Sequence, residues 1–125
     1  MNKQKFVERL LELNLPIGSF CVFSGGSLLL QGVRDKTNDV DIAITKDLAN
    51  KIGLYDMEKD EYGMYLLQSD VQCNDNFEEL DKVKVDGFWC ESLESVLEFK
   101  KHLKRPKDLT DIKLIEKCLN SRQNY

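Results

Sequence analysis

The sequence has 125 residues, of which 42% are hydrophobic and 32% charged, a composition typical of one globular domain spanning residues 1–125. Its formal net charge of −4 excludes a protein that coats nucleic acid by charge alone. Four scattered cysteines, with no C-x-x-C pair, argue against a zinc site or a disulfide framework. No segment resembles a signal peptide or a membrane span, so we expect a cytoplasmic protein without a membrane partner.

The first elements in chain order alternate between helix and strand. Apolar residues at helical spacing predict a helix over residues 6–14. The short apolar run 20–23 predicts a buried strand, and the leucine-rich residues 27–31 predict a short helix. Strict alternation over residues 39–45 predicts a strand, followed by a short helix over 46–52.

The second half of the chain begins with strands and ends with helices. The apolar run in residues 62–73 predicts one strand, and residues 83–85 and 88–90 flank Asp-Gly and predict a hairpin. Ser92 is a candidate N-cap for a helix through Leu103, and Pro106 suits the first turn of a final helix. The order α–β–α–β–α–β–β–β–α–α predicts an α/β (α+β) fold with a small mixed β-sheet flanked by helices.

Two acidic residues share one face of the predicted strand 39–45. Side chains two residues apart in a strand project to the same side, so the carboxylates of Asp39 and Asp41 point together. Adjacent like charges repel unless a cation neutralises them. Because oxygen ligands suit Mg²⁺ or Mn²⁺, this pair is a candidate metal site, although two solvated aspartates on a strand would give the same pattern.

A glycine-rich turn precedes this strand. Gly25, Gly26 and Ser27 follow a buried strand and open a helix. Glycines allow close backbone approach, and free N–H groups at the start of a helix can bind phosphate. The same three residues would also make an ordinary strand–helix turn with Ser27 as a cap. The sequence contains neither a Walker loop nor a dinucleotide-binding fingerprint.

Taken together, these motifs resemble a known superfamily. The stretch VFSGGSLLLQGVRDKTNDVDIAI, residues 22–44, resembles the signature of the DNA polymerase β-like nucleotidyltransferase superfamily. It is most similar to the small single-domain prokaryotic and phage-type members. The stretch FKKHLKRPKDLTDI, residues 99–112, is similar to a second segment of those groups. The resemblance covers residues 20–119 and implies a nucleotidyltransferase fold.

The resemblance also implies roles for individual residues. Gly26 and Ser27, with Gly25 in the same turn, would hold the triphosphate of a nucleoside triphosphate substrate. Asp39 and Asp41 would bind the metal ions, and a third carboxylate on a neighbouring strand would activate an acceptor hydroxyl. Two divalent ions about 3.5–4 Å apart would then stabilise the attacking and leaving oxygens.

The residues leave the third carboxylate open. Asp70 follows a strand-like run and is the first choice for both metal binding and catalysis, with Asp75 and Asp86 as alternatives. Arg34 and Thr37 lie in the loop leading to Asp39, where they could reach a substrate phosphate or could only stabilise the loop.

Two functional hypotheses follow. The first is an enzyme that transfers a nucleoside monophosphate to a hydroxyl of a small molecule, an RNA or a protein. The alternative is a catalytically weak binding module of the same fold, such as an antitoxin-type interaction partner. The short chain leaves no room for a separate acceptor-binding domain, which a homodimer partner could supply.

Overall fold

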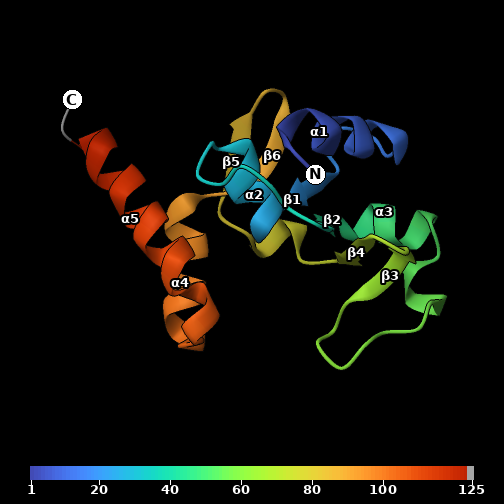
Figure 1. The fold of residues 1–125 in the computed structure, drawn as a ribbon. Helices are drawn as coiled ribbons and strands as arrows, with labels where there is room; N and C mark the ends of the chain where they lie inside the picture. The colour runs from blue at the N-terminus through green and yellow to red at the C-terminus, as the bar shows by residue number, and fades with distance from the viewer. Residues whose placement is uncertain (124–125) are drawn as a thin grey trace.

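The computed structural model describes residues 1–123 and shows a mixed α/β fold built on one six-stranded sheet (Figure 1). The strand order across the sheet is β3-β4-β2-β1-β6-β5. The predicted fold class is thereby confirmed. The strands are β1 (Phe20–Val22), β2 (Val40–Ile44), β3 (Tyr65–Gln68), β4 (Val71–Asn74), β5 (Lys82–Val85) and β6 (Phe88–Glu91).

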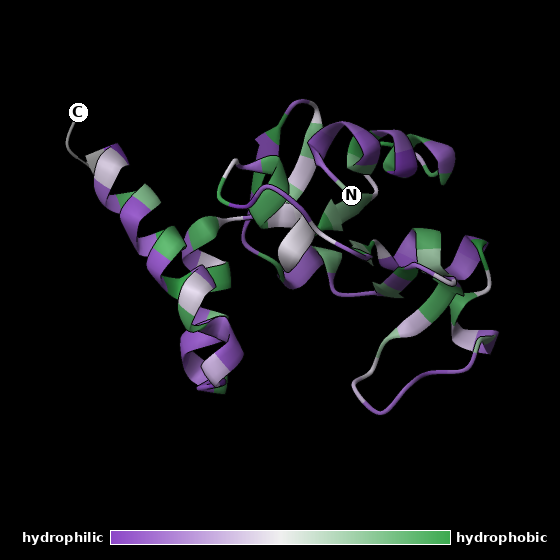
Figure 2. Cartoon of the chain, viewed as in Figure 1, coloured by the Kyte–Doolittle hydropathy of each residue, from purple (hydrophilic) through white to green (hydrophobic). Residues whose placement is uncertain are grey.

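Three helices from the first half of the chain cover one face of this sheet. Their side chains join the core with alternate strand residues such as Val22, Ile42 and Ile44, which are fully buried. Figure 2 shows the matching pattern, with hydrophobic residues on the strands and hydrophilic ones on the outer side of α1. These helices are α1 (Lys3–Glu12), α2 (Gly25–Leu30) and α3 (Lys46–Lys51).

The register of the central strands brings the end of β1 to the acidic part of β2. The strands β1 and β2 are antiparallel, with Val22 opposite Ile42, and the N–H of Phe23 donates to the carbonyl of Asp41 at 3.0 Å. On its other side, β2 pairs in parallel with β4, which places Gln72 in register with Asp41. The chain therefore leaves β1 for α2 directly beside the acidic end of β2.

Two strands replace the single one expected over residues 62–73. A turn at Ser69 and Asp70 separates β3 from β4, which pair antiparallel with an irregular register. The expected single strand is therefore wrong. The hairpin of β5 and β6 is confirmed, with Asp86 and Gly87 both at positive φ in its turn.

The last two helices form a separate hairpin next to the β5–β6 side of the sheet (Figure 1). Helix α4 (Leu93–Leu103) begins at Ser92, whose hydroxyl accepts from the Ser95 N–H as expected of an N-cap. A 3₁₀ turn starting at Pro106 leads into α5 (Leu109–Gln123), and Ile115 joins the small core under the hairpin. Within residues 1–123, none of the helices combines the length and apolar character needed to cross a membrane.

Candidate functional site

The two aspartates of the predicted metal site lie at the start of β2. Asp39 is exposed and immediately precedes the strand, and Asp41 is partly buried within it. Burial, followed by the charge of Asp39, raises the pKa of the Asp41 carboxyl to about 6. The repulsion between Asp39 and Asp41 that the sequence predicts is thus present. The protein itself neutralises the charge of the Asp41 carboxylate incompletely.

The three residues of the glycine-rich turn have different surroundings. A Cβ on Gly26 would lie 2.5 Å from the Phe6 ring and 2.7 Å from Val22 Cγ1, so Gly26 is where α2 packs closely on the core. Ser27 is fully buried, and its Oγ donates to the Ser24 carbonyl at 2.6 Å. The side chain of Ser27 therefore closes the turn internally.

Gly25 instead lies against the two loop residues that the sequence singled out. A Cβ at this position would be 2.9 Å from Thr37 Oγ1 and 3.0 Å from Arg34 Nη1. Only a residue without a side chain allows a hydroxyl and a guanidinium to approach the backbone this closely. We call Gly25, Arg34 and Thr37 the cradle; Gly25 and Thr37 are buried, and the Arg34 guanidinium is the partly exposed donor of the three.

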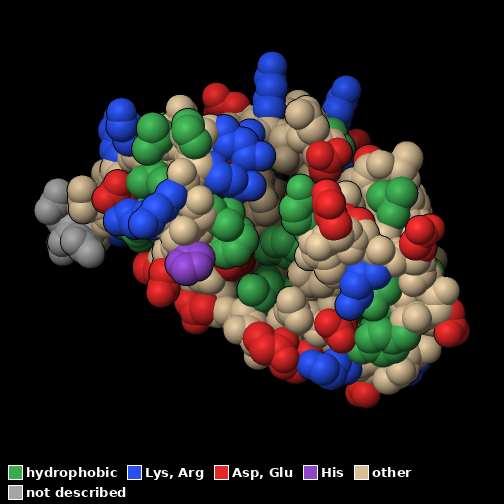
Figure 3. Space-filling view, turned by 90° about the horizontal axis from the view of Figure 1, so that it is seen from below, with side chains coloured by type: hydrophobic (Ala, Val, Ile, Leu, Met, Phe, Trp, Pro, Cys, Tyr) green, Lys and Arg blue, Asp and Glu red, His purple; other side chains and the backbone are tan. Residues whose placement is uncertain are grey.

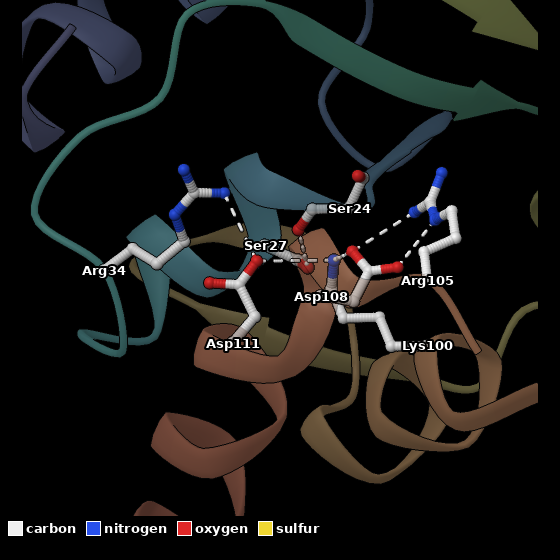
Figure 4. A network of polar contacts seen from close by, with 7 residues as sticks. All are labelled: Ser24, Ser27, Arg34, Lys100, Arg105, Asp108 and Asp111. Carbon is white, nitrogen blue, oxygen red and sulfur yellow. Dashed lines mark hydrogen bonds and ion pairs between the residues drawn. The ribbon is translucent and has the colours of Figure 1, made fainter. Parts of the chain in front are cut away.

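An ionic network joins the cradle to the C-terminal hairpin (Figure 4). Asp111 Oδ2 lies 3.7 Å from Arg34 Nη1 and 3.3 Å from Lys100 Nζ. Lys100 also donates to Asp108 at 3.0 Å, and Arg105 binds the same Asp108 carboxylate through two nitrogens. Arg34, Lys100 and Arg105 thus share the carboxylates of Asp108 and Asp111 beside α2.

Asp70, the expected third carboxylate, has a different partner. Arg9 of α1 donates to both of its carboxylate oxygens, at 2.9 and 2.8 Å. The hydrogen bonds from Arg9 lower the pKa of the Asp70 carboxyl below its ordinary value. Because Arg9 belongs to α1, which packs on the sheet face opposite to Asp41, this ion pair directs the Asp70 carboxylate toward α1.

The structure describes partners for all three candidates, and the third carboxylate stays a prediction. Among residues 1–123, no group of three or more His, Cys, Asp or Glu side chains is placed to hold a metal ion. The alternatives are also engaged elsewhere: Asp75 accepts from the Tyr55 hydroxyl at 2.7 Å, and Asp86 pairs with Lys3 at 3.0 Å in the hairpin turn.

Amides occupy the neighbouring strand where a third carboxylate would be expected. Gln72 of β4 is in register with Asp41, and Asn74 is in register with Ala43, so both share the face of Asp41. Their side chains can bind a ligand through oxygen or nitrogen but cannot serve as a carboxylate base.

Sequence reasoning missed one acidic residue of this region, Glu91 at the end of β6. Only 8% of Glu91 is exposed, and Ser95 Oγ donates to its carboxylate at 2.7 Å. Burial raises the pKa of this carboxyl, although hydrogen bonds from Ser95 and from the Ser24 backbone oppose the shift. No local pattern singles it out, because only the pairing of β6 with β1 brings Glu91 beside the residues that follow β1.

The molecular surface is hollowed between the C-terminal hairpin and the body of the sheet (Figure 3). Lys and Arg side chains gather on one margin of the hollow, and Asp and Glu side chains line part of the opposite margin. A ligand that carries both metal-bound and free phosphate groups would be electrostatically complementary to two margins of opposite charge.

A divalent cation fits the acidic pair chemically. Mg²⁺ is commonly bound by one or two carboxylates together with substrate phosphates, and not by a complete cage of protein ligands. Asp39 and Asp41 supply two carboxylates, and the raised pKa of Asp41 shows that a neighbouring positive charge would be favourable.

Comparisons of this chain with protein-family models, with curated proteins and with solved structures found no match.

Proposed function

We propose that this protein is a metal-dependent nucleotidyltransferase, which transfers a nucleoside monophosphate from a nucleoside triphosphate to a hydroxyl acceptor. The observation that carries the proposal is the position of Asp39 and Asp41. Asp39 immediately precedes β2 and Asp41 lies within it; β2 pairs with β1, and the chain passes from β1 through Phe23 and Ser24 into α2, which begins at Gly25.

In this proposal Asp39 and Asp41 hold Mg²⁺ or Mn²⁺, which when bound neutralises phosphate charge and polarises the reacting oxygens. Arg34 and Thr37 bind and orient the phosphate chain over Gly25. The exposure of the Arg34 side chain, 37%, leaves its guanidinium accessible to a ligand. The acceptor class is a small molecule, an RNA or a protein side chain.

A second candidate function is a binding module of the same fold that retains metal–nucleotide binding without efficient transfer. The observation that favours it is the pair of amides, Gln72 and Asn74, on the strand beside Asp41. General-base catalysis contributes about 10²–10⁴-fold to a rate, so its loss would leave binding intact and turnover slow.

Metal-dependent binding tests the part that both candidates share. With Mg²⁺ and a hundredfold excess of the bound nucleoside triphosphate over its Kd, the protein should be stabilised by about 2.7 kcal/mol. The stabilisation should vanish with EDTA and in Asp41→Ala, because the metal then lacks one of its two carboxylates. Thermal melting with each of the four ribonucleoside triphosphates measures it, and an equal shift in Asp41→Ala would refute the site.

Transfer separates the two candidates. Incubation with each labelled nucleoside triphosphate, Mg²⁺, and a host RNA and protein extract should label an acceptor in a reaction that Asp41→Ala cannot perform. Binding without labelling of any fraction, small molecules included, would favour the binding module.

A further inference from the structure

The C-terminal hairpin carries a groove of about 360 Å³ between the end of α4 and the start of α5. Its lining combines basic and apolar side chains, among them Lys101, Lys104, Arg105, Pro106, Leu109 and Ile112. Leu109 is 56% exposed, so apolar surface lies open to solvent between positive charges. A surface of this kind is complementary to a partner segment that is both acidic and apolar.

The cations of the groove differ in how far the protein itself pairs them. Arg105 binds the buried carboxylate of Asp108, and Lys101 lies 3.5 Å from Glu116. Lys104 ends α4 in the left-handed conformation and is exposed, and within residues 1–123 it forms no ion pair. Its ammonium is therefore available to an acidic partner.

The same chain contains a segment with the complementary character. Residues 55–62, which we call the acidic segment, contain four acidic residues and one lysine, a formal charge of −3. All eight residues are exposed. Tyr62, at 82%, is the most exposed large hydrophobic residue that the structure describes, and Met57 is 37% exposed. The acidic segment thus offers negative charge and apolar surface together.

Hydrogen bonds hold the end of the acidic segment in a defined turn. Asp60 Oδ1 accepts from the N–H of Tyr62 at 2.8 Å and from the N–H of Met64 at 2.9 Å. The N–H of Asp60 donates to the carbonyl of Met64 at 2.8 Å. Because this backbone is already ordered, less conformational entropy is lost when Tyr62 meets a partner.

The groove and the acidic segment lie at opposite ends of the molecule (Figure 1). The hairpin of α4 and α5 is next to the β5–β6 side of the sheet, whereas the pairing of Lys59 with Tyr65 places the acidic segment beside β3, at the other edge. One copy of the chain therefore cannot place its acidic segment in its own groove, but a second copy can.

We propose that the protein associates with itself, with the acidic segment of one copy docked in the groove of another. The acids of the segment meet the lysines of the groove, and Tyr62 covers the exposed surface of Leu109. The contact joins two different surfaces and is therefore heterologous. It is separate from the proposed nucleotide site and needs no metal ion.

The size and charge of the contact set its expected strength. A contact centred on one groove belongs to the weak class of interfaces, so we expect a Kd of about 100 μM in about 50 mM salt. Exposed charges are screened by salt, so the association should weaken as the salt concentration rises.

Two single changes test the two surfaces separately. Leu109→Asp places an acid in the groove, and Tyr62→Asp removes the exposed ring from the acidic segment. Each should raise the Kd of self-association at least about tenfold. Ile17→Asp, the same kind of change at a residue that is 59% exposed and outside both surfaces, is the matched control and should leave the Kd unchanged. Sedimentation velocity over a concentration series measures all four proteins.

A mixture of the two variants tests which surface meets which. Leu109→Asp keeps an intact acidic segment, and Tyr62→Asp keeps an intact groove. An equimolar mixture therefore contains one functional pair of surfaces and should form a 1:1 dimer at least about tenfold more tightly than either variant associates alone. Because the other two surfaces are both blocked, the mixed assembly should stop at the dimer.

The outcomes that would overturn the inference are distinct. A wild type that stays monomeric up to about 1 mM in low salt overturns it and leaves the groove to an acidic segment of another protein. A mixture that associates no better than the separate variants also overturns it, as does an equal loss of association in Ile17→Asp. If Leu109→Asp does not fold, as judged by circular dichroism, Lys104→Glu replaces it, because it reverses the charge of an exposed side chain in the same groove.

Discussion

At the scale of single residues, Asp41 combines burial with a like charge nearby. Both factors disfavour its ionised form and raise the pKa of its carboxyl to about 6. A group whose pKa is higher in the folded than in the unfolded protein makes folding less favourable once it ionises. The free protein therefore carries, at neutral pH, a destabilising charge that a divalent cation would offset.

This leads to a prediction for stability against pH. In the absence of divalent cations, Asp41→Asn should be more stable than the wild type by about 2–3 kcal/mol at pH 7.5, from a shift of about two pKa units. The difference should develop as pH rises from 4 to 6, between the ordinary and the raised pKa, and should shrink toward zero near pH 4. Urea unfolding across this range measures it. A constant difference at every pH would contradict it.

Added Mg²⁺ and nucleoside triphosphate should reverse the order of the two proteins. Ligand binding raises the free energy of unfolding of the wild type. Asp41→Asn has lost the charge of one of the two carboxylates proposed to bind the metal. The urea unfolding of both proteins is therefore repeated at pH 7.5 with saturating ligand. This control tests whether the effect of pH on stability comes from the proposed metal site.

At the scale of elements, Arg9 connects α1 to the turn between β3 and β4. Its guanidinium binds Asp70 through two nitrogens and also donates to the side-chain oxygen of Gln68. The backbone carbonyl of Asp70 in turn accepts from the N–H of Val40 at 2.8 Å, where β2 begins. The structure therefore gives Asp70 a part in holding a helix and two neighbouring strands together.

Asp70→Asn accordingly should reduce stability by about 1 kcal/mol at pH 7, the upper range for a partly exposed ion pair with paired hydrogen bonds. Because the pKa of Asp70 is lowered by Arg9, this contribution is present above the ordinary carboxyl pKa and is lost as pH falls through the lowered one. Arg9→Gln should cost about as much, and the double variant little more than either.

The same variant checks the site assignment. If the proposed site is correct, Asp70→Asn should leave Mg²⁺-dependent nucleotide binding unchanged, because Asp70 is paired with Arg9 and no group of three acidic ligands forms within residues 1–123. Loss of metal-dependent binding in Asp70→Asn, with stability intact, would restore Asp70 to the metal site.

The fold class, the hairpin turn and the helix caps could be predicted from local signals such as Asp-Gly and the Ser92 cap. The turn at Ser69 and Asp70 could not. Neither residue has positive φ, so the turn does not need the glycine or asparagine that normally marks a short hairpin. The turn places Asp70 outside both strands, where its carboxylate accepts two hydrogen bonds from Arg9.

The structure brings Gly25, Arg34 and Thr37 together, and their role in phosphate binding stays a prediction, whereas Glu91 gave no comparable signal. Its neighbours Cys90 and Ser92 predict the end of a strand and a helix cap, where an acid is usually solvated. Only the parallel pairing of β6 with β1, between residues about 70 positions apart in the sequence, brings it to Ser24. Local sequence patterns do not predict strand pairing between residues so far apart.

At the scale of the whole molecule, the protein has two hydrophobic clusters joined by charged residues. The larger lies under α1, α2 and α3, and the smaller contains Leu28 of α2 with residues of α4 and α5. Between the helices of the hairpin, Lys100 is 6% exposed and Asp108 is 3% exposed. Burial alone would raise the pKa of Asp108, but hydrogen bonds from Arg105 and Lys100 outweigh it and lower the pKa.

The last prediction concerns this buried pair. Asp108→Asn should destabilise the protein by about 3 kcal/mol, because removing one partner leaves the Lys100 ammonium buried with less compensating charge. The double variant Lys100→Met/Asp108→Asn should recover a large part of that loss, since it contains no buried cation and methionine fills a similar volume. Urea unfolding at pH 7 measures the stability of Asp108→Asn, of Lys100→Met and of the double variant. Lys101→Met, a change at an exposed lysine of the same helix, is the matched control.

The pH dependence gives an independent check on the same pair. The contribution of Asp108 is present above the ordinary carboxyl pKa and is lost as pH falls through its lowered pKa, so Asp108→Asn and the wild type should converge in acid. If the losses of Lys100→Met and Asp108→Asn simply add in the double variant, the two charges are not coupled. The hairpin would then be held by its small apolar cluster alone, and the ionic network would serve only to present positive charge beside Gly25.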